Sequence, residues 1–315
     1  MRNSCEMKEK IILFGAGKIG NEAIAYYGKN NIKYICDNNL SLQGKRIEGI
    51  EVISFEKLKG IYDEYRIIIS VLNPEAIKQI VKMLEDNNIK YYFFMDDIDT
   101  NETVKNVFTD IYYKKKWGGS EDYYSGYGSH DIDIIMPYID LLINIIINND
   151  INTICDVGCG DFNIMNIVLT RLLNEGINCD YLGIDVVEKL IVNNNEKYGS
   201  DNCHFECMDV SDENVELPCR DLLIVRQVLQ HLSNELISVI INKMNGFKYV
   251  LVTEHIYDRK VTYYNLDKTT NLFTRVDKMS GVYLEKEPFC CKNIVHLLSV
   301  PCDIGIIRTS IIINK

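Results

Sequence analysis

Two stretches of the chain each join a hydrophobic run to a glycine-rich turn and then to a helical pattern. The first is IILFGAGKIGNEA, residues 11–23, and the second is TICDVGCGDFNIM, residues 153–165. A glycine turn between a strand and a helix presents backbone N–H groups to a nucleotide or a similar ligand. The repetition predicts two α/β, Rossmann-like units, and leaves open which of the two loops serves the chemistry.

Short apolar runs alternate with helical patterns in two blocks, which is typical of mostly parallel sheets covered by helices. The first block predicts strands at 10–14, 32–36, 66–71 and 90–94, and helices near 18–29 and 73–87. The second predicts a leading helix at 131–148, strands at 152–157, 180–185, 203–208, 221–226 and 248–253, and a further strand in the closing IGIIRTSIIIN. We place a small accessory domain at 1–99, a linker, lid and leading helix at 100–150, and the main domain at 151–315.

Composition and charge narrow the class of partner. The 315 residues suffice for two hydrophobic cores, and about −10 of the net charge of −11 falls on residues 100–315. An acidic domain repels a phosphate backbone, so we expect a small-molecule partner and no nucleic acid. No apolar run suits a membrane span and the N-terminus lacks the apolar core of a signal peptide, so we expect a cytoplasmic protein with reduced cysteines. The oligomeric state stays open.

The first loop carries a moderately specific fingerprint. Gly15, Gly17 and Gly20 form G-x-G-x-x-G, and Asp37 ends the next predicted strand, where a ribose-binding acid would lie. The sequence FGAGKIG…YICDNN…GKRIEGIEVIS resembles the small Rossmann-like domain attached to transferases of bacterial surface-polysaccharide pathways, in some of which the loop contacts a nucleotide-sugar. Two interpretations stay open: the loop binds a nucleotide, or its glycines only permit tight packing of strand and helix.

The second loop is accompanied by three acids. Asp156 lies in D-x-G-x-G with Gly158 and Gly160, while Asp185 and Asp209 end the next two predicted strands. Carboxyl ends of parallel strands meet at one crevice, where open α/β sheets bind ligands. The spacing suits a single ligand. The segment CHFEC, residues 203–207, places its histidine and its cysteines on opposite faces of a strand, so we expect no metal site.

Residues from about 105 to 315 resemble the class I S-adenosylmethionine-dependent methyltransferases. The resemblance rests on WGGSEDYYSGYGS, DVGCGDFNIM, YLGIDVVEKLI, RQVLQHLS and YVLVTEH, and it points to a branch found near polysaccharide and small-molecule modification genes. It implies a mostly parallel seven-stranded sheet. Two departures are Tyr127, where the branch favours proline, and the long gap of 29 positions between Asp156 and Asp185.

This resemblance also implies roles for residues around S-adenosyl-L-methionine. The Gly158–Gly160 turn would pass close to the methionine part, Asp185 would accept from the ribose hydroxyls, and Asp209 would meet the adenine amino group. The residues expected to bind the cofactor are Asp156, Gly158, Gly160, Asp161, Asp185, Asp209 and Arg226. For Asp161, capping of the following helix is the alternative.

Proton transfer and closure of the site involve other residues. A hydroxyl acceptor needs a base, and we propose His255 first and His231 second, with Glu254 beside them, because they follow predicted strands whose ends face the crevice. For His231 the alternative is a packed helix histidine. Residues 117–129 contain glycines that permit hinge motion, so we expect them to form a lid. Its marker residues are Trp117, Ser125, Gly126 and Ser129.

These features together favour transfer of a methyl group to a small polar acceptor. The resemblances point to a hydroxyl of a sugar or of a sugar-linked surface-polysaccharide precursor, so an O-methyltransferase is expected. A phosphate-linked or amine-bearing metabolite is the alternative acceptor. From other classes, the chain could be an NAD-dependent oxidoreductase that uses the first loop, or a nucleotide-sugar-binding protein with a degenerate methyltransferase domain.

Overall fold

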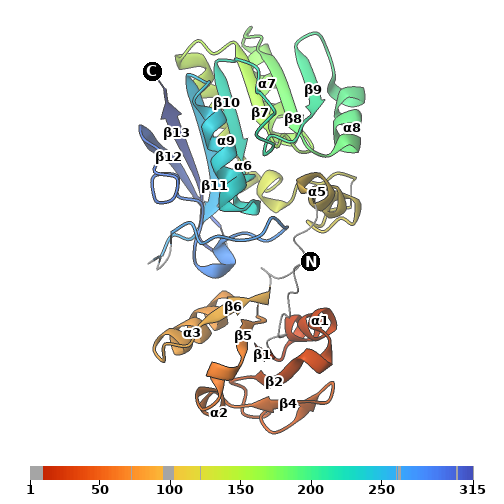
Figure 1. Cartoon of the computed structure of the whole chain (residues 1–315). Coiled ribbons are helices and arrows are strands. Elements are labelled where there is room, and N and C mark those ends of the chain that lie inside the picture. The colour runs from red at the N-terminus through yellow and green to blue at the C-terminus, as the bar shows by residue number, and fades with distance from the viewer. Residues whose placement is uncertain are drawn as a thin grey trace, which may run out of the picture. The chain divides into compact units, whose positions relative to one another are not determined.

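The structure is a computed structural model in which residues 10–71, 73–94, 103–120, 122–259, 261, 264–302 and 304–314 are described. The chain divides into two compact units, Met1–Thr100 and Asn101–Lys315, and each is considered by itself (Figure 1). Within the described ranges, no helix has the length and apolar character needed to cross a membrane.

The first unit contains a six-stranded sheet. Its elements are β1 (Ile11–Phe14), α1 (Lys18–Tyr27), η1 (Lys29–Asn31), β2 (Ile32–Cys36), β3 (Arg46–Ile47), β4 (Ile50–Ile53), α2 (Phe55–Lys59), η2 (Tyr62–Glu64), β5 (Arg66–Ile69), α3 (Pro74–Glu85) and β6 (Tyr91–Phe93). The strand order is β3-β4-β2-β1-β5-β6, and neighbours are parallel except β3 and β4. The chain leaves β1 toward β2 on one side and returns through β5 on the other, which creates a switch point between β1 and β5.

The second unit contains a seven-stranded sheet. Its elements are α5 (Val104–Tyr113), η3 (Tyr127–Ser129), α6 (Ile132–Asn148), β7 (Thr153–Val157), α7 (Asn163–Asn174), β8 (Asp180–Asp185), α8 (Glu188–Tyr198), β9 (Cys203–Cys207), β10 (Leu222–Arg226), η4 (Leu229–His231), α9 (Asn234–Met244), β11 (Tyr249–Ile256), η5 (Val276–Lys278), β12 (Ile294–Pro301) and β13 (Ile306–Ile313). The order is β12-β13-β11-β10-β7-β8-β9, and β13 is antiparallel to both neighbours. The sheet is therefore mostly parallel.

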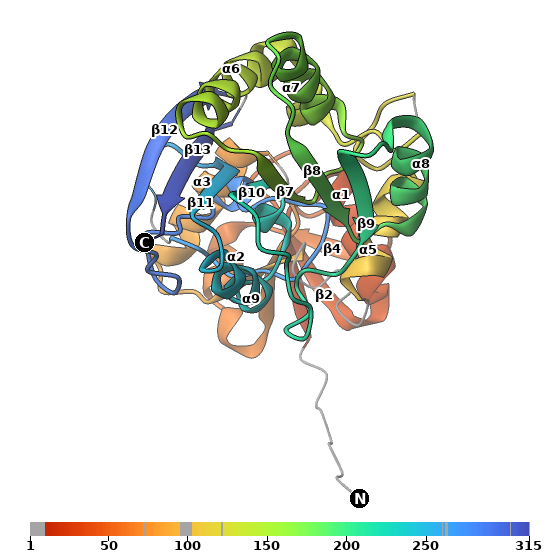
Figure 2. The same cartoon turned by 90° about the horizontal axis from the view of Figure 1, so that it is seen from above.

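Helices cover both faces of this larger sheet (Figure 2). On the face of α6 and α7, Ile154 and Ile224 are buried in one apolar cluster. On the face of α9, Cys155 and Val225 are buried in another. Adjacent strand residues point to opposite faces, and both faces are dry. This double burial explains why the central strands appear in the sequence as continuous hydrophobic runs.

The predicted strands are present, but several elements were not predicted. The short hairpin of β3 and β4 turns at Glu48 and Gly49, both with positive φ, and its two-residue first strand leaves little sequence pattern. Helix α5 lies in the stretch interpreted as linker and is capped by the Thr103 hydroxyl, which accepts from Asn106 N at 3.2 Å. Strand β12 forms an exposed edge of the sheet, so it lacks the buried alternation that marks a strand.

Candidate active site

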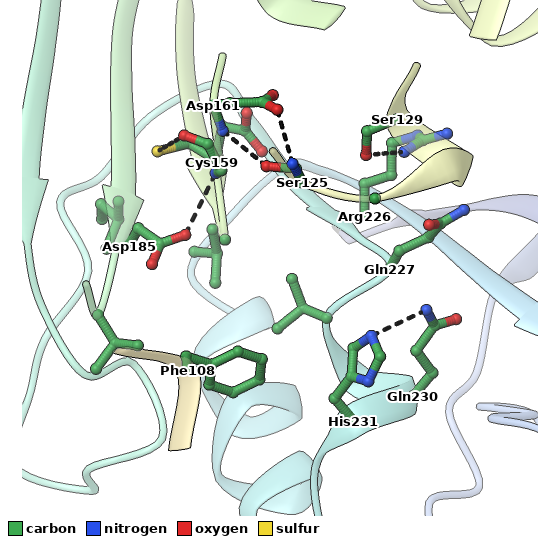
Figure 3. A pocket seen from close by; sticks show the side chains of 18 of the residues that line it. Phe108, Ser125, Ser129, Cys159, Asp161, Asp185, Arg226, Gln227, Gln230 and His231 are labelled. Atoms are coloured by element: carbon green, nitrogen blue, oxygen red, sulfur yellow. Dashed lines mark hydrogen bonds between the residues drawn. The ribbon is translucent and has the colours of Figure 1, made fainter. Parts of the chain in front are cut away.

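A cavity of about 300 Å³ lies at the carboxyl ends of the central strands in the second unit (Figure 3). Of the residues singled out from the sequence, it is lined by Trp117, Ser125, Gly126, Ser129, Asp156, Gly158, Gly160, Asp161, Asp185, Asp209, Arg226 and His231. The glycine loop and Ser125 line one side, and Phe108 and His231 lie across from them. The structure thus brings the proposed cofactor-binding residues, the segment 117–129 and one of the three catalytic candidates to a single cavity.

The glycine loop after β7 depends on its glycines at two positions. Gly158 and Gly160 have φ of 72° and 55°, in the region that side chains disfavour. A Cβ on Gly158 would lie 2.2 Å from Val228, and one on Gly160 would lie 2.4 Å from the Ser125 hydroxyl. Larger residues would therefore distort the loop and close the approach to its backbone.

Two carboxyl groups beside this loop are buried. Asp156 accepts a hydrogen bond from the Tyr181 hydroxyl at 2.8 Å, and burial raises its pKa to about 7. Asp185 accepts from Gly160 N at 3.3 Å and from Val187 N at 3.0 Å, and burial raises its pKa to about 6. Desolvation disfavours both ionised forms, so a cationic or hydrogen-bond-donating ligand would favour their ionisation.

Asp209 lies two residues beyond β9, on the same cavity. Its Oδ1 accepts from the backbone N of Ser211 at 3.0 Å and from the Ser211 hydroxyl. This turn fixes the carboxyl beside the end of the strand. The arrangement agrees with the strand-end pattern of the sequence, in which an acid lies at or just beyond the end of each of three neighbouring strands.

The segment 117–129 is held against the glycine loop by a set of hydrogen bonds. Asp161 accepts from Ser125 N at 2.8 Å and donates its own N–H to the Ser125 hydroxyl at 2.9 Å. His130 Nε2 lies 2.7 Å from the Asp161 carboxylate. On the opposite side, Arg226 donates to Gly128 O at 2.7 Å. Asp161 and Arg226, predicted from the sequence to bind the cofactor, line the cavity and also hold the segment 117–129. Their role toward the cofactor stays a prediction.

His130, which directly follows the segment 117–129, is a residue to which the sequence analysis gave no role. Its ring stacks on Tyr124 with centroids 4.3 Å apart, and it pairs with Asp161. Asn163 adds a further bond by donating from Nδ2 to Ser129 O at 2.8 Å. No local spacing in the sequence links these positions, because about 30 residues separate the partners.

Glu254 lies within β11, beside the turn after β10, and it does not line the cavity. Its buried carboxylate accepts from three successive backbone N–H groups, those of Val228, Leu229 and Gln230, at 3.2, 2.9 and 2.9 Å. Burial raises its pKa to about 8. The expected catalytic position is therefore corrected: this carboxylate shapes the turn that follows β10.

His255 is also away from the cavity lining. It was expected to follow the strand, but β11 continues to Ile256, and His255 pairs with Ile307 within the sheet. Its Nε2 is hydrogen-bonded to Ile304 O. The His255 side chain is thus hydrogen-bonded to the loop before β13 and does not point toward a methyl acceptor in the cavity. This corrects the prediction of His255 as the first candidate for the base.

His231 does line the cavity, although its environment opposes a role as base. The Gln230 carbonyl Oε1 accepts from His255 N at 2.9 Å, which leaves its amide Nε2 to donate to His231 Nε2 at 3.2 Å. The basic nitrogen is therefore occupied. Burial, with Lys268 nearby, lowers the pKa of His231 to about 3. The neutral ring therefore lines the cavity but does not act as a proton acceptor.

The first loop lines a separate cavity of about 420 Å³ within the first unit, at the switch point between β1 and β5. A Cβ on Gly15 would lie 2.8 Å from Ser70 O, and one on Gly20 would lie 2.3 Å from Gly15 O, so packing alone requires these two glycines. At Gly17, a Cβ would meet no atom within 4 Å and would face open space. Asp37 accepts from Ala16 N at 2.8 Å and so braces the loop.

No group of three or more metal-ligating side chains is gathered anywhere in the described ranges. Within CHFEC, Cys203 is buried, whereas Cys207 and His204 are exposed. The His204 Nε2 atom is hydrogen-bonded to the Asp201 carbonyl oxygen at 3.0 Å.

No family model and no curated protein matches the chain. Solved structures that are similar to it include the magnesium protoporphyrin IX methyltransferase of Synechocystis PCC 6803 with bound S-adenosylhomocysteine, with 14% identity over 68% of this chain and 100% of that one and a TM-score of 0.45. The N-methyltransferase NodS of Bradyrhizobium japonicum WM9, with the same ligand, has 10% identity over 66% and 98% of the two chains and a TM-score of 0.47. Human N-acetylserotonin methyltransferase with S-adenosylmethionine has 13% identity over 68% and 60%, with a TM-score of 0.40.

Proposed function

We propose that the second unit transfers a methyl group from S-adenosyl-L-methionine to a small acceptor. The observation that carries this proposal is the set of three carboxyls, Asp156, Asp185 and Asp209, which surround one glycine loop on one cavity. A sulfonium ligand is cationic and has ribose hydroxyls and an adenine amino group that donate hydrogen bonds. Carboxyls at the ends of three neighbouring strands suit all of these groups.

Within this proposal, each part of the site has a role. The backbone of Gly158 and Gly160 approaches the methionine part, Asp185 accepts from the ribose, and Asp209 accepts from the adenine amino group. S-adenosylmethionine supplies an activated methyl carbon. The residues of the chain then align donor and acceptor and exclude water, and this alignment is the main contribution to the rate.

We further propose an O-methyltransferase, whose acceptor is a hydroxyl of a sugar or a related small molecule. The support is the resemblance of both parts of the sequence to proteins of surface-polysaccharide and small-molecule modification. An amine-bearing acceptor is the alternative. The two acceptors differ in the group that must lose a proton, which is a hydroxyl in one case and an amine in the other. Glu254 and His255 lie off the cavity, and His231 has its Nε2 occupied and its pKa lowered to about 3, so no histidine base is assigned.

A second binding function in the first unit is favoured by one observation. Gly17 is required neither by positive φ nor by packing, yet it borders the cavity at the end of β1. In dinucleotide-binding loops a glycine at this place allows the pyrophosphate to approach the backbone. We propose that a nucleotide or nucleotide-sugar binds there, and titration with NAD and uridine diphosphate sugars would test it.

Calorimetric titration of the full chain with S-adenosylmethionine and S-adenosylhomocysteine tests the main proposal. We expect both to bind, and Asp185→Ala to weaken binding by about 1.5–3 kcal/mol through lost hydrogen bonds to a charged group. Asp201→Ala, at an exposed turn of the same unit, is the matched control and should leave affinity unchanged. Binding of NAD with no binding of S-adenosylmethionine or S-adenosylhomocysteine would favour the oxidoreductase instead.

A further inference from the structure

Arg226, at the carboxyl end of β10, is the one arginine among the described residues that line the cavity, and no lysine accompanies it. Its Nη2 donates to Gly128 O at 2.7 Å, and its Nη1 donates to the Ser129 hydroxyl at 3.3 Å. The buried Nε has no hydrogen-bond partner. The partners of this guanidinium are thus uncharged, and one of its donors is unsatisfied.

The positive charge of Arg226 is not neutralised by the protein. Within the described ranges, no carboxylate forms an ion pair with it. Burial lowers the pKa of Arg226, whereas the acids Asp156 and Glu254 act in the opposite sense. Both acids have raised pKa values, about 7 and about 8, so neither supplies a full negative charge at neutral pH. A buried cation without a counter-charge is costly, and an anionic group of a ligand would remove that cost.

The order of the strand ends indicates which part of a ligand would reach Arg226. The neighbouring strands β9, β8, β7 and β10 lead, in that order, to Asp209, Asp185, the Gly158–Gly160 turn and Arg226. Adjacent strands are about 4.8 Å apart, so this row spans about 14 Å. Figure 3 shows the glycine loop between Asp185 and Arg226. With adenine at Asp209 and ribose at Asp185, as proposed above, the methionine part crosses the loop toward Arg226.

We propose, on the basis of the methyl transfer proposed above, that Arg226 binds the carboxylate of the methionine part of S-adenosyl-L-methionine. This carboxylate supplies the missing counter-charge and accepts hydrogen bonds from the edge of the guanidinium that the protein leaves unused. The same side chain holds Gly128 and Ser129, so it joins the cofactor to the segment 117–129. The aspartates serve the nucleoside and the sulfonium, and this cation serves the opposite end of the cofactor.

The contribution of the carboxylate can be measured with two ligands. S-adenosyl-3-thiopropylamine is the decarboxylated analogue of S-adenosylhomocysteine and differs from it in the carboxylate alone. Calorimetric titration of the full chain with each ligand should give a Kd at least about tenfold higher for the analogue. Equal affinities would overturn the proposal. If neither ligand bound, the methyltransferase proposal itself would fail, and the role of Arg226 with it.

Variants of Arg226 assign this preference to the guanidinium. Arg226→Gln should bind S-adenosylhomocysteine at least about tenfold more weakly and the analogue within about twofold of the wild type, so the preference disappears. Arg226→Lys keeps the charge and should retain part of the preference, which also provides a test if Arg226→Gln does not fold. Arg171→Gln, on α7 and paired with Asp140, is the control and should change neither affinity.

Two results with Arg226→Gln would contradict the proposal. Equal weakening of both ligands would mean that Arg226 acts only by holding the segment 117–129. An undiminished preference for S-adenosylhomocysteine would mean that another group binds its carboxylate, and that the anion for Arg226 comes from the methyl acceptor.

Discussion

At the scale of single residues, burial sets the proton affinity of the groups around the cavity. Asp156 and Asp185 have pKa values raised to about 7 and about 6, because desolvation disfavours their charged forms. The pKa of His231 is shifted in the opposite sense, to about 3, for the same reason. At neutral pH the histidine is therefore uncharged, Asp156 lies near its midpoint, and Asp185 is mostly ionised.

This predicts a pH-dependent affinity for S-adenosylmethionine. The cationic ligand favours the ionised carboxyls, so affinity should rise with pH and level off above about pH 8, where both groups are already ionised. Between about pH 5.5 and 7 binding should release protons, and affinity should change by about tenfold or more. Calorimetry in buffers of different ionisation enthalpy measures the release. An affinity that is flat across this range would show that neither carboxyl titrates with binding.

A second residue-scale prediction concerns Glu254. Glu254→Gln replaces one acceptor oxygen by an amide that faces a backbone N–H, so at least one buried donor loses its partner. We expect the free energy of unfolding to fall by about 1–3 kcal/mol, measured in urea. Glu196→Gln, exposed on α8, should leave stability unchanged. If Glu254→Gln kept full stability and lost only turnover, a direct catalytic role would be restored.

At the scale of elements, the segment 117–129 is attached to the β7–α7 loop and to the end of β10. Its contacts join Ser125 and His130 to Asp161, and Gly128 to Arg226. We propose that this segment is a lid, which would open by breaking these specific bonds and not by free hinge motion. Entry of a ligand into the cavity would then be coupled to this small set of interactions.

His130→Ala should loosen the lid. Loss of the hydrogen bond to Asp161 and of the stacking on Tyr124 should lower local stability by about 1–2 kcal/mol. Limited proteolysis within 117–129 should become several-fold faster, and S-adenosylhomocysteine should slow it again. His204→Ala, at an exposed position of β9, is the control. Unchanged cleavage in His130→Ala would mean that other contacts hold the segment.

At the scale of the whole molecule, the chain has two compact units that each carry a strand, a glycine loop and a helix. Each loop borders its own cavity. The proposed chemistry belongs to the second unit, and the first is proposed as an accessory binding unit.

If the units are independent, a fragment spanning residues 101–315 should fold and bind S-adenosylmethionine with the affinity of the full chain. Gly17→Val in the full chain should leave that affinity unchanged, because its side chain would enter only the cavity of the first unit. Calorimetry on both proteins measures this. A fall in affinity in the Gly17 variant would indicate that the two loops act together.

The sequence by itself determined those features that depend on local order along the chain. Buried parallel strands show as apolar runs, and the residues at their ends are next to them in sequence, so local order alone places Asp156, Asp185 and Asp209 on one crevice. Gly158 and Gly160 followed from the same pattern. For β12, β3 and α5 the local signal was weak, because an exposed edge strand, a two-residue strand and a capped helix in a polar segment lack that periodicity.

Only the tertiary structure decided which polar side chains face the cavity. Strand β11 ends three residues later than predicted, so His255 lies within the sheet. The carboxyl group of Glu254 accepts hydrogen bonds from backbone N–H groups of a turn that is distant in sequence. The orientation of Gln230, set by a bond from β11, occupies the basic nitrogen of His231. These outcomes depend on strand length and on contacts between residues about 25 positions apart, and such long-range partners are chosen by packing and leave no pattern in the local sequence.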